Sequence, residues 1–169
     1  MGPALPTLTA MTSPNEISVL FVCLGNICRS PLAEGVFLHL LVAEGHEDAF
    51  RVDSAGTGGW HVGHPPDPRS QEVAERNGVA LVSRARQVRG EDFHEFDLIV
   101  AMDRSNLHDL VSLRERHGGS ARVVLMRDFD PDPGDGEVPD PYYGGPAGFD
   151  HVFEMVLRSA RGLLDDLVS

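Results

Sequence analysis

The chain has 169 residues and a net charge of −12, with 41% hydrophobic and 24% charged residues. This length suits one domain with a sizeable core, and the acidic charge argues against non-specific binding to nucleic acid or to an anionic membrane. No apolar run is long enough to span a bilayer. All 14 cationic side chains are arginine, which excludes a Walker-type ATP site and Schiff-base chemistry, because both need lysine.

The start of the chain lacks the basic and continuous apolar regions of a signal peptide. We expect a disordered leader at residues 1–15, in which Met11 is a second candidate start, and one domain at residues 16–169. Cys23 and Cys28 are the only cysteines, and they lie too close together to staple a fold. Both features favour a cytoplasmic protein in a reducing compartment.

In chain order, the apolar patterns predict a strand at 17–23, a helix at 31–44, a strand at 51–55, a helix at 70–77, a strand at 97–102, a helix at 104–117, a strand at 121–126 and a helix at 149–168. Gly78 and Gly118 are suited to end the second and third helices. Strands that alternate with helices indicate an α/β fold with a parallel sheet between helical layers. Ligands bind such sheets beyond the carboxyl ends of the strands, and the first strand ends at Cys23.

The segment CLGNICR, residues 23–29, joins the first strand to the first helix. The N-terminus of a helix attracts anions, because its first N–H groups have no partners. Gly25 and Asn26 tolerate the left-handed backbone that a phosphate-binding loop requires, and Arg29 can bind two oxygens with its fork. These groups would also lower the pKa of Cys23 and favour its thiolate. The alternative is an inert buried cysteine at the end of a core strand.

CLGNICRSP resembles the signature of the low-molecular-weight protein tyrosine phosphatases. The resemblance continues in order through VDSAGTGGWHVG, DPRSQEV, ARQVRGEDF, AMDRSNLHDL and DPYYGG, almost the whole chain after residue 16. It implies a single-domain, three-layer α/β/α fold with a four-stranded parallel twisted sheet. It also implies hydrolysis of phosphotyrosine in proteins and of small aryl phosphates, with inorganic phosphate as product and with no metal or cofactor.

The resemblance assigns the nucleophile to Cys23, which attacks phosphorus and forms a cysteinyl-phosphate intermediate. Arg29 and the loop amides stabilise the equatorial oxygens as charge develops on them. Ser30 is expected to hydrogen-bond the thiolate, to cap the following helix, or both. Asn26 is expected to brace the loop, with Ser54 of the second strand as its partner. Between nucleophile and arginine the loop consists of Leu24, Gly25, Asn26, Ile27 and Cys28.

A leaving phenolate needs a proton donor, and the stretch from Asp128 to Asp140 is rich in carboxylates. Its acidic residues are Asp128, Asp130, Asp132, Asp135, Glu137 and Asp140. Such a run is more often a solvated acidic loop, and spacing alone does not choose among its members. Pro139 and Pro141 restrict the backbone around Asp140, and the DPYYGG resemblance indicates the same residue. We therefore expect Asp140 to act as general acid and then as general base.

A phosphotyrosine pocket needs apolar or aromatic walls, for which Trp60, Tyr142 and Tyr143 are candidates beside Leu24 and Ile27. By the family pattern, Cys28 could form a reversible disulfide with Cys23 under peroxide; otherwise Cys28 is a small loop residue. His61 and His64 lie in HVGH, but two loop histidines without further ligands are weak grounds for a metal site. Ser83 stands where many relatives have a histidine that braces the loop asparagine.

Two alternatives stay open from the residues. An arsenate reductase on the same scaffold relays a disulfide to further cysteines, but this chain has none after Cys28. A non-catalytic phosphoprotein-binding module would use the phosphate loop without chemistry. The presence of both a nucleophile and a candidate acid favours catalysis over binding alone.

Overall fold

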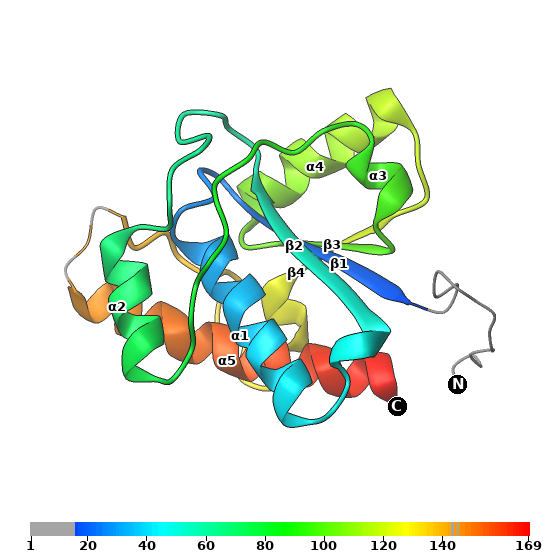
Figure 1. Cartoon of the computed structure of the whole chain (residues 1–169). Coiled ribbons are helices and arrows are strands. Elements are labelled where there is room, and N and C mark those ends of the chain that lie inside the picture. Colours follow the sequence, from blue (N-terminus) through cyan, green and yellow to red (C-terminus); the bar gives the residue numbers. More distant parts are fainter. Residues whose placement is uncertain (1–15, 143, 145) are drawn as a thin grey trace.

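A computed structural model describes residues 16–142, 144 and 146–169 (Figure 1). The predicted leader, residues 1–15, and Tyr143 lie outside the described residues. In chain order the elements are β1 (Ile17–Cys23), α1 (Arg29–Ala43), η1 (Glu47–Ala49), β2 (Phe50–Gly56), α2 (Pro68–Arg76), α3 (Asp92–Glu95), β3 (Leu98–Ala101), α4 (Arg104–His117), β4 (Arg122–Leu125), η2 (Met126–Phe129) and α5 (Pro146–Val168).

The four strands form one parallel sheet in the order β2-β1-β3-β4. Helices α1, α2 and α5 lie on one side of the sheet, while α3 and α4 lie on the other (Figure 1). The predicted three-layer α/β/α architecture is therefore confirmed. The chain leaves β1 toward one helical layer and leaves β3 toward the other. The carboxyl end of β1, at Cys23, consequently opens beside the point where the direction of the crossovers changes, which is where ligands bind in such sheets.

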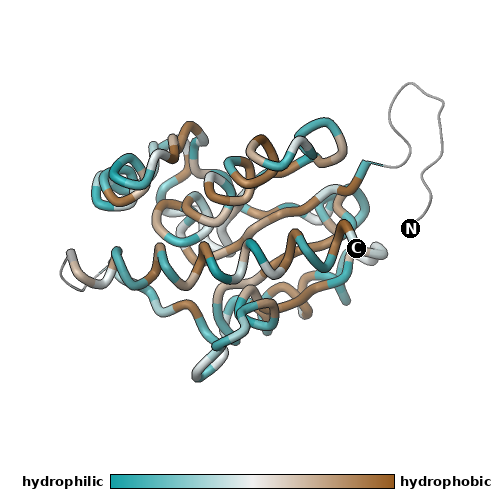
Figure 2. The backbone as a smooth tube through the Cα atoms, turned by 90° about the horizontal axis from the view of Figure 1, so that it is seen from below, coloured by the Kyte–Doolittle hydropathy of each residue, from teal (hydrophilic) through white to brown (hydrophobic). Residues whose placement is uncertain are grey.

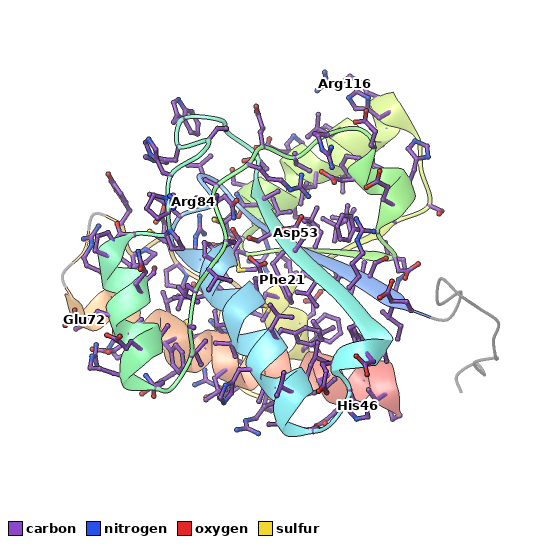
Figure 3. All side chains as sticks on the ribbon, in the orientation of Figure 1. Phe21, His46, Asp53, Glu72, Arg84 and Arg116 are labelled. Carbon is purple, nitrogen blue, oxygen red and sulfur yellow. The ribbon has the colours of Figure 1, made fainter. Side chains whose placement is uncertain are left out.

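Each side of the sheet has its own buried cluster of apolar side chains. Val19 and Phe21 of β1 pack toward α1 and α5, whereas Leu20 and Val22 pack toward α3 and α4. Successive side chains of a strand point to opposite faces, so a strand covered on both faces is apolar throughout. Figure 2 shows this apolar run through the middle of the molecule and the alternation of apolar and hydrophilic turns along α5. Figure 3 shows Phe21 inside this body and Glu72 and Arg116 at its periphery.

Predicted and observed elements agree in type and order, and differ by one to three residues at most ends. The first helix begins at Arg29 instead of residue 31, and α5 begins at Pro146 instead of residue 149. The helix at Arg104–His117 agrees at both ends, and Gly78 and Gly118 follow α2 and α4 with positive φ angles of 77° and 75°. The apolar patterns of the sequence do not predict the short α-helix α3 or the 3-10 helices η1 and η2. Among the described helices, not one has both the length and the apolar character needed to cross a membrane.

Candidate active site

The loop between β1 and α1 wraps around the sulfur of Cys23. Asn26 has φ 58°, the left-handed conformation expected for this position, and its backbone N–H donates to Cys23 Sγ at 3.3 Å. Ser30 Oγ lies 3.1 Å from the same sulfur. The prediction that Ser30 caps the helix is wrong: α1 begins at Arg29 with Cys28 in the capping position, and no side chain caps it. The loop winds directly into the first turn, which turns the Ser30 hydroxyl toward the sulfur.

The side chain of Asn26 joins the loop to β2. Its Nδ2 donates to Ser30 Oγ at 2.8 Å and to Ser54 Oγ at 3.0 Å, and its Oδ1 accepts from the backbone N–H of Arg86 at 3.0 Å. The expected partner Ser54 is therefore in contact with Asn26. Ser30 Oγ accepts from Asn26, so its own proton can point to the sulfur of Cys23 at 3.1 Å or to the carbonyl of Ala55 at 3.4 Å.

Glu34 extends this network and was missed from the sequence. Ser54 Oγ donates to Glu34 Oε1 at 2.6 Å, and Ser83 also hydrogen-bonds this carboxyl. Burial raises the pKa of Glu34, as does the charge of Asp53; the two serine hydrogen bonds and Arg86 oppose the rise without cancelling it. Ser83 thus joins the brace through Glu34. The available signal was the spacing, since Glu34 lies one helical turn after Ser30 and faces the same side.

Arg29 is 2% exposed and is held from two directions. Its Nη1 donates to Asp103 Oδ2 at 2.6 Å and to the carbonyl of Val138 at 3.0 Å. Burial works against the charge of Arg29, but the negative charges of Cys23, Asp103 and Asp140 outweigh it and raise the pKa of the guanidinium. Asp103, which follows β3 in the AMDRSNL segment and caps α4 through the N–H of Asn106, was not predicted as part of the site.

Only one of the six carboxylates between residues 128 and 140 lines the pocket at the sulfur. Asp140 Oδ2 lies 3.8 Å from Nη2 of Arg29, and its Oδ1 accepts from the N–H of Tyr142 at 3.0 Å. Its side chain keeps 40% of its surface exposed. By contrast, Asp130 is buried against arginines, and Glu137 faces Arg104. The structure therefore distinguishes Asp140 from the other five candidate carboxylates, which the sequence spacing alone does not.

The pocket has a volume of about 400 Å³. It is lined by Cys23, Leu24, Gly25, Ile27, Cys28, Arg29, Trp60, His61, Asp140 and Tyr142. Trp60 is 70% exposed and forms part of the rim instead of a core contact. A wider hollow of about 540 Å³ lies beside α2, but no nucleophile lines it. The smaller pocket, which the predicted nucleophile lines, is therefore the candidate active site.

The sequence indicates His61 only as a weak candidate for a metal ligand, whereas in the structure it lines the pocket. A Cβ added at Gly25 would lie 3.0 Å from Cδ2 of His61, so the imidazole packs directly on the phosphate loop. Its ring centroid is 5.6 Å from that of His64 and 6.4 Å from that of Tyr142. In the part of the chain that the structure describes, no three potential metal-binding side chains gather at one point.

The sequence matches the family model of the low molecular weight phosphotyrosine protein phosphatases over residues 18–169. The chain belongs to this family. It is 46% identical to a low molecular weight protein-tyrosine-phosphatase of Streptomyces coelicolor, over 86% of this chain and 90% of that one. It is 43% identical to the low molecular weight phosphotyrosine protein phosphatase of Homo sapiens, over 88% and 94% of the two chains.

The comparison of folds agrees with the comparison of sequences. It matches the crystal structure of a protein tyrosine phosphatase from Entamoeba histolytica with a TM-score of 0.85 and 37% identity, over 90% of this chain and 97% of that one. The expected family, its four-stranded parallel fold and its cysteine-dependent, metal-independent protein tyrosine phosphatase activity are thereby confirmed.

The second cysteine of the phosphate loop, Cys28, has surroundings that favour its neutral form. Cys28 is buried, and burial raises its pKa to about 12, with further contributions from the charges of Asp67, Cys23 and Asp140 that exceed the opposite effect of Arg69. Cys28 is therefore a protonated thiol at neutral pH and has little nucleophilic character of its own. Both cysteines are free.

Proposed function

We propose that this phosphatase hydrolyses phosphotyrosine in proteins through Cys23, Arg29 and Asp140. The observation that carries the proposal is their convergence: sulfur, guanidinium and carboxylate open on one pocket although they come from distant parts of the chain. The Cys23 thiolate attacks phosphorus, the phosphorus–oxygen bond to the tyrosine breaks, and Asp140 gives its proton to the leaving oxygen. Asp140 then takes a proton from water, which attacks the cysteinyl phosphate and releases inorganic phosphate and the thiolate.

Each group in the pocket has a distinct part in this sequence. The Arg29 fork and the loop amides bind the equatorial oxygens, on which charge develops in both transition states. Ser30 stabilises the thiolate as nucleophile and as leaving group. Leu24, Ile27, Trp60 and Tyr142 form the apolar slot for the aromatic ring, which favours aryl phosphates over alkyl ones.

Turnover of para-nitrophenyl phosphate and of a phosphotyrosine peptide tests the assignment. We expect Cys23→Ser to lose activity by a factor on the order of 10⁴ or more, and Asp140→Ala to lose about 10²–10³ on the peptide. Asp132→Ala is the matched control, because this exposed carboxylate lies in the same loop but does not line the pocket. Turnover that survives Cys23→Ser would overturn the mechanism. If Cys23→Ser is inactive as expected, phosphoproteins that it captures from a lysate would identify substrates.

Cys28 serves, in the same proposal, as a guard of the nucleophile in a reducing cytoplasm. Peroxide oxidises the Cys23 thiolate to a sulfenic acid, and the Cys28 thiol displaces water to form a disulfide. The raised pKa of Cys28 supports oxidation of Cys23 as the first step, and the place of both cysteines on one short loop supports the disulfide. Mass spectrometry of peroxide-treated protein should find the loop peptide lighter by two hydrogens, with activity restored by a thiol reductant. A stable sulfinic acid on Cys23 in the wild type would contradict the guard.

A further inference from the structure

Arg127 is a buried cation that the mechanism above does not use. It lies in η2, directly after β4, and is 4% exposed. Its Nη1 donates to the carbonyl of Glu137 at 2.6 Å, and its Nη2 donates to the carbonyl of Asp132 at 3.1 Å. One guanidinium therefore holds two backbone positions of the loop that ends at Asp140.

The charge of Arg127 is balanced by Asp130, whose side chain is fully buried. Nε of Arg127 lies 2.9 Å from Asp130 Oδ2, without the alignment of a hydrogen bond. Arg158 of α5 forks onto the same carboxylate at 3.1 and 3.2 Å. Burial opposes the charge of Asp130, but hydrogen bonds from Arg158 and the Asp132 amide, with both cations, lower its pKa. The Asp130 carboxylate thus stays charged and balances Arg127, whose Nη1 and Nη2 groups donate to backbone carbonyls.

The carbonyl that Arg127 binds is adjacent to the one that Arg29 binds. Arg127 holds Glu137 O from one side, and Arg29 holds Val138 O at 3.0 Å from the pocket side. The N–H of Val138 donates to the carbonyl of Met102 at 2.8 Å. Pro139, with its fixed φ, is the only residue between this anchored point and Asp140. The position of the Asp140 carboxylate therefore follows from where residues 137 and 138 are held.

We propose that Arg127 is a positioning residue for the proton donor of this phosphatase, acting through the backbone of the loop and touching neither substrate nor Asp140. The inference rests on the proposed role of Asp140. Displacing a general acid affects substrates unequally, because a phenol of high pKa needs the proton and an acidic nitrophenol leaves without much help. A merely structural role would lower the amount of active enzyme and affect all substrates alike.

The test compares kcat/KM for phenyl phosphate with kcat/KM for para-nitrophenyl phosphate, since kcat/KM covers the steps up to loss of the phenol. This ratio does not depend on the fraction of folded protein. We expect Arg127→Met to lower the ratio about tenfold. Arg158→Met is the matched control: it removes the other cation on Asp130 but no contact to a loop carbonyl, so its ratio should stay within about twofold of wild type. Arg127→Lys, if Arg127→Met does not fold, should give an intermediate fall.

An equal loss on both substrates in the Arg127 variants would overturn the inference, as would the same fall in ratio for Arg158→Met. Asp140→Ala separates this failure from failure of the proposed function. If Asp140→Ala lowers the ratio and Arg127→Met does not, only the positioning role of Arg127 is wrong. If Asp140→Ala leaves the ratio unchanged, Asp140 is not the acid and both proposals fail. In the Asp140→Ala background, Arg127→Met should cause no further fall in the ratio.

Discussion

In the phosphate loop, residues 23–30, the contacts that fix the backbone come from neutral side chains: Asn26 joins Ser30 to Ser54 of β2. In the acid loop, residues 128–140, they come from arginines that bind backbone carbonyls, with Arg127 on Glu137 O and Arg29 on Val138 O. The first loop is braced from within and from the neighbouring strand. The second is held by two cations outside it: Arg127, which directly precedes the loop, and Arg29 from the first turn of α1.

The difference follows from what each loop must do. A site for a phosphate dianion needs free N–H groups and positive charge, so carboxylates as braces beside the sulfur would repel the substrate. The acid loop instead has to deliver one carboxylate, and Arg127 holds its backbone through carbonyls without pairing with Asp140. Arg29 belongs to both systems: it faces the pocket and also binds Val138 O. Breaking this shared contact is the most severe test of the comparison.

Arg29→Lys should have the largest effect. A lysine keeps the charge but loses the fork that binds two oxygens and the contacts to Asp103 and Val138. We expect kcat/KM for aryl phosphates to fall about 10³-fold. Arg69→Lys is the control, because Arg69 is paired with Asp67 and does not line the pocket, and its loss should stay below about threefold. If Arg29→Lys kept a tenth of the wild-type kcat/KM, the positive charge would account for most of the effect of Arg29 and the fork for little of it.

Gly56→Ala tests whether the phosphate loop depends on its close approach to β2. A Cβ at Gly56 would lie 2.7 Å from the carbonyl oxygen of Leu24 and 3.1 Å from that of Gly58, so the loop backbone must shift. A displacement of about 1 Å at reacting groups can reduce the rate about 10²-fold, which we expect here. At Gly59 a Cβ would press on the amide of the exposed Gln87 side chain, which can move aside, and would lie in ordinary contact with Val62, so Gly59→Ala is the matched control. Equal kcat/KM values for the two variants would contradict the argument.

The phosphate loop was predictable because its parts are contiguous. Asn26 takes the left-handed conformation that its residue type led us to expect, and Ser54 is its partner, as the family resemblance implied. The capping role of Ser30 was wrong because the loop's own winding, and not a side chain, starts α1.

The acid loop was predictable only in its final residue. The anchors of its backbone are carbonyl oxygens, which every residue has, so no sequence pattern marks Glu137 or Val138 as the positions that Arg127 and Arg29 bind. The turn η2 escaped prediction for the same reason: its form depends on packing against α5, where a Cβ on Gly162 would clash with the carbonyl of Phe129. Such contacts between distant segments outweigh local propensity.

Glu34→Gln tests the carboxyl at the far end of the phosphate-loop brace. Because the pKa of Glu34 is raised in the folded protein, the folded state binds this proton more tightly than the unfolded state does. Its contribution to stability is therefore full at low pH and is lost as the pH rises above the ordinary value near 4.5. We expect Tm to fall between pH 5 and pH 8 in the wild type, and to fall by a few degrees less in Glu34→Gln. Thermal unfolding at the two pH values measures both falls. Parallel Tm curves would indicate that Glu34 ionises normally.

Arg104→Ala should have the smallest effect and sharpens the comparison within the acid loop. Arg104 also binds a carbonyl of this loop, with Nη1 donating to Asp135 O at 2.9 Å, and it lies 3.6 Å from the Glu137 carboxylate, but its side chain is 60% exposed. Exposed ionic contacts contribute little because water competes for both partners. The backbone N–H of Arg104, which donates to Glu137 Oε2, remains in the variant. We expect kcat/KM for phenyl phosphate to fall less than about threefold. If Arg104→Ala, which removes one carbonyl contact, matched Arg127→Met, which removes two, neither burial nor the number of carbonyl contacts would explain what makes an arginine an effective anchor of this loop.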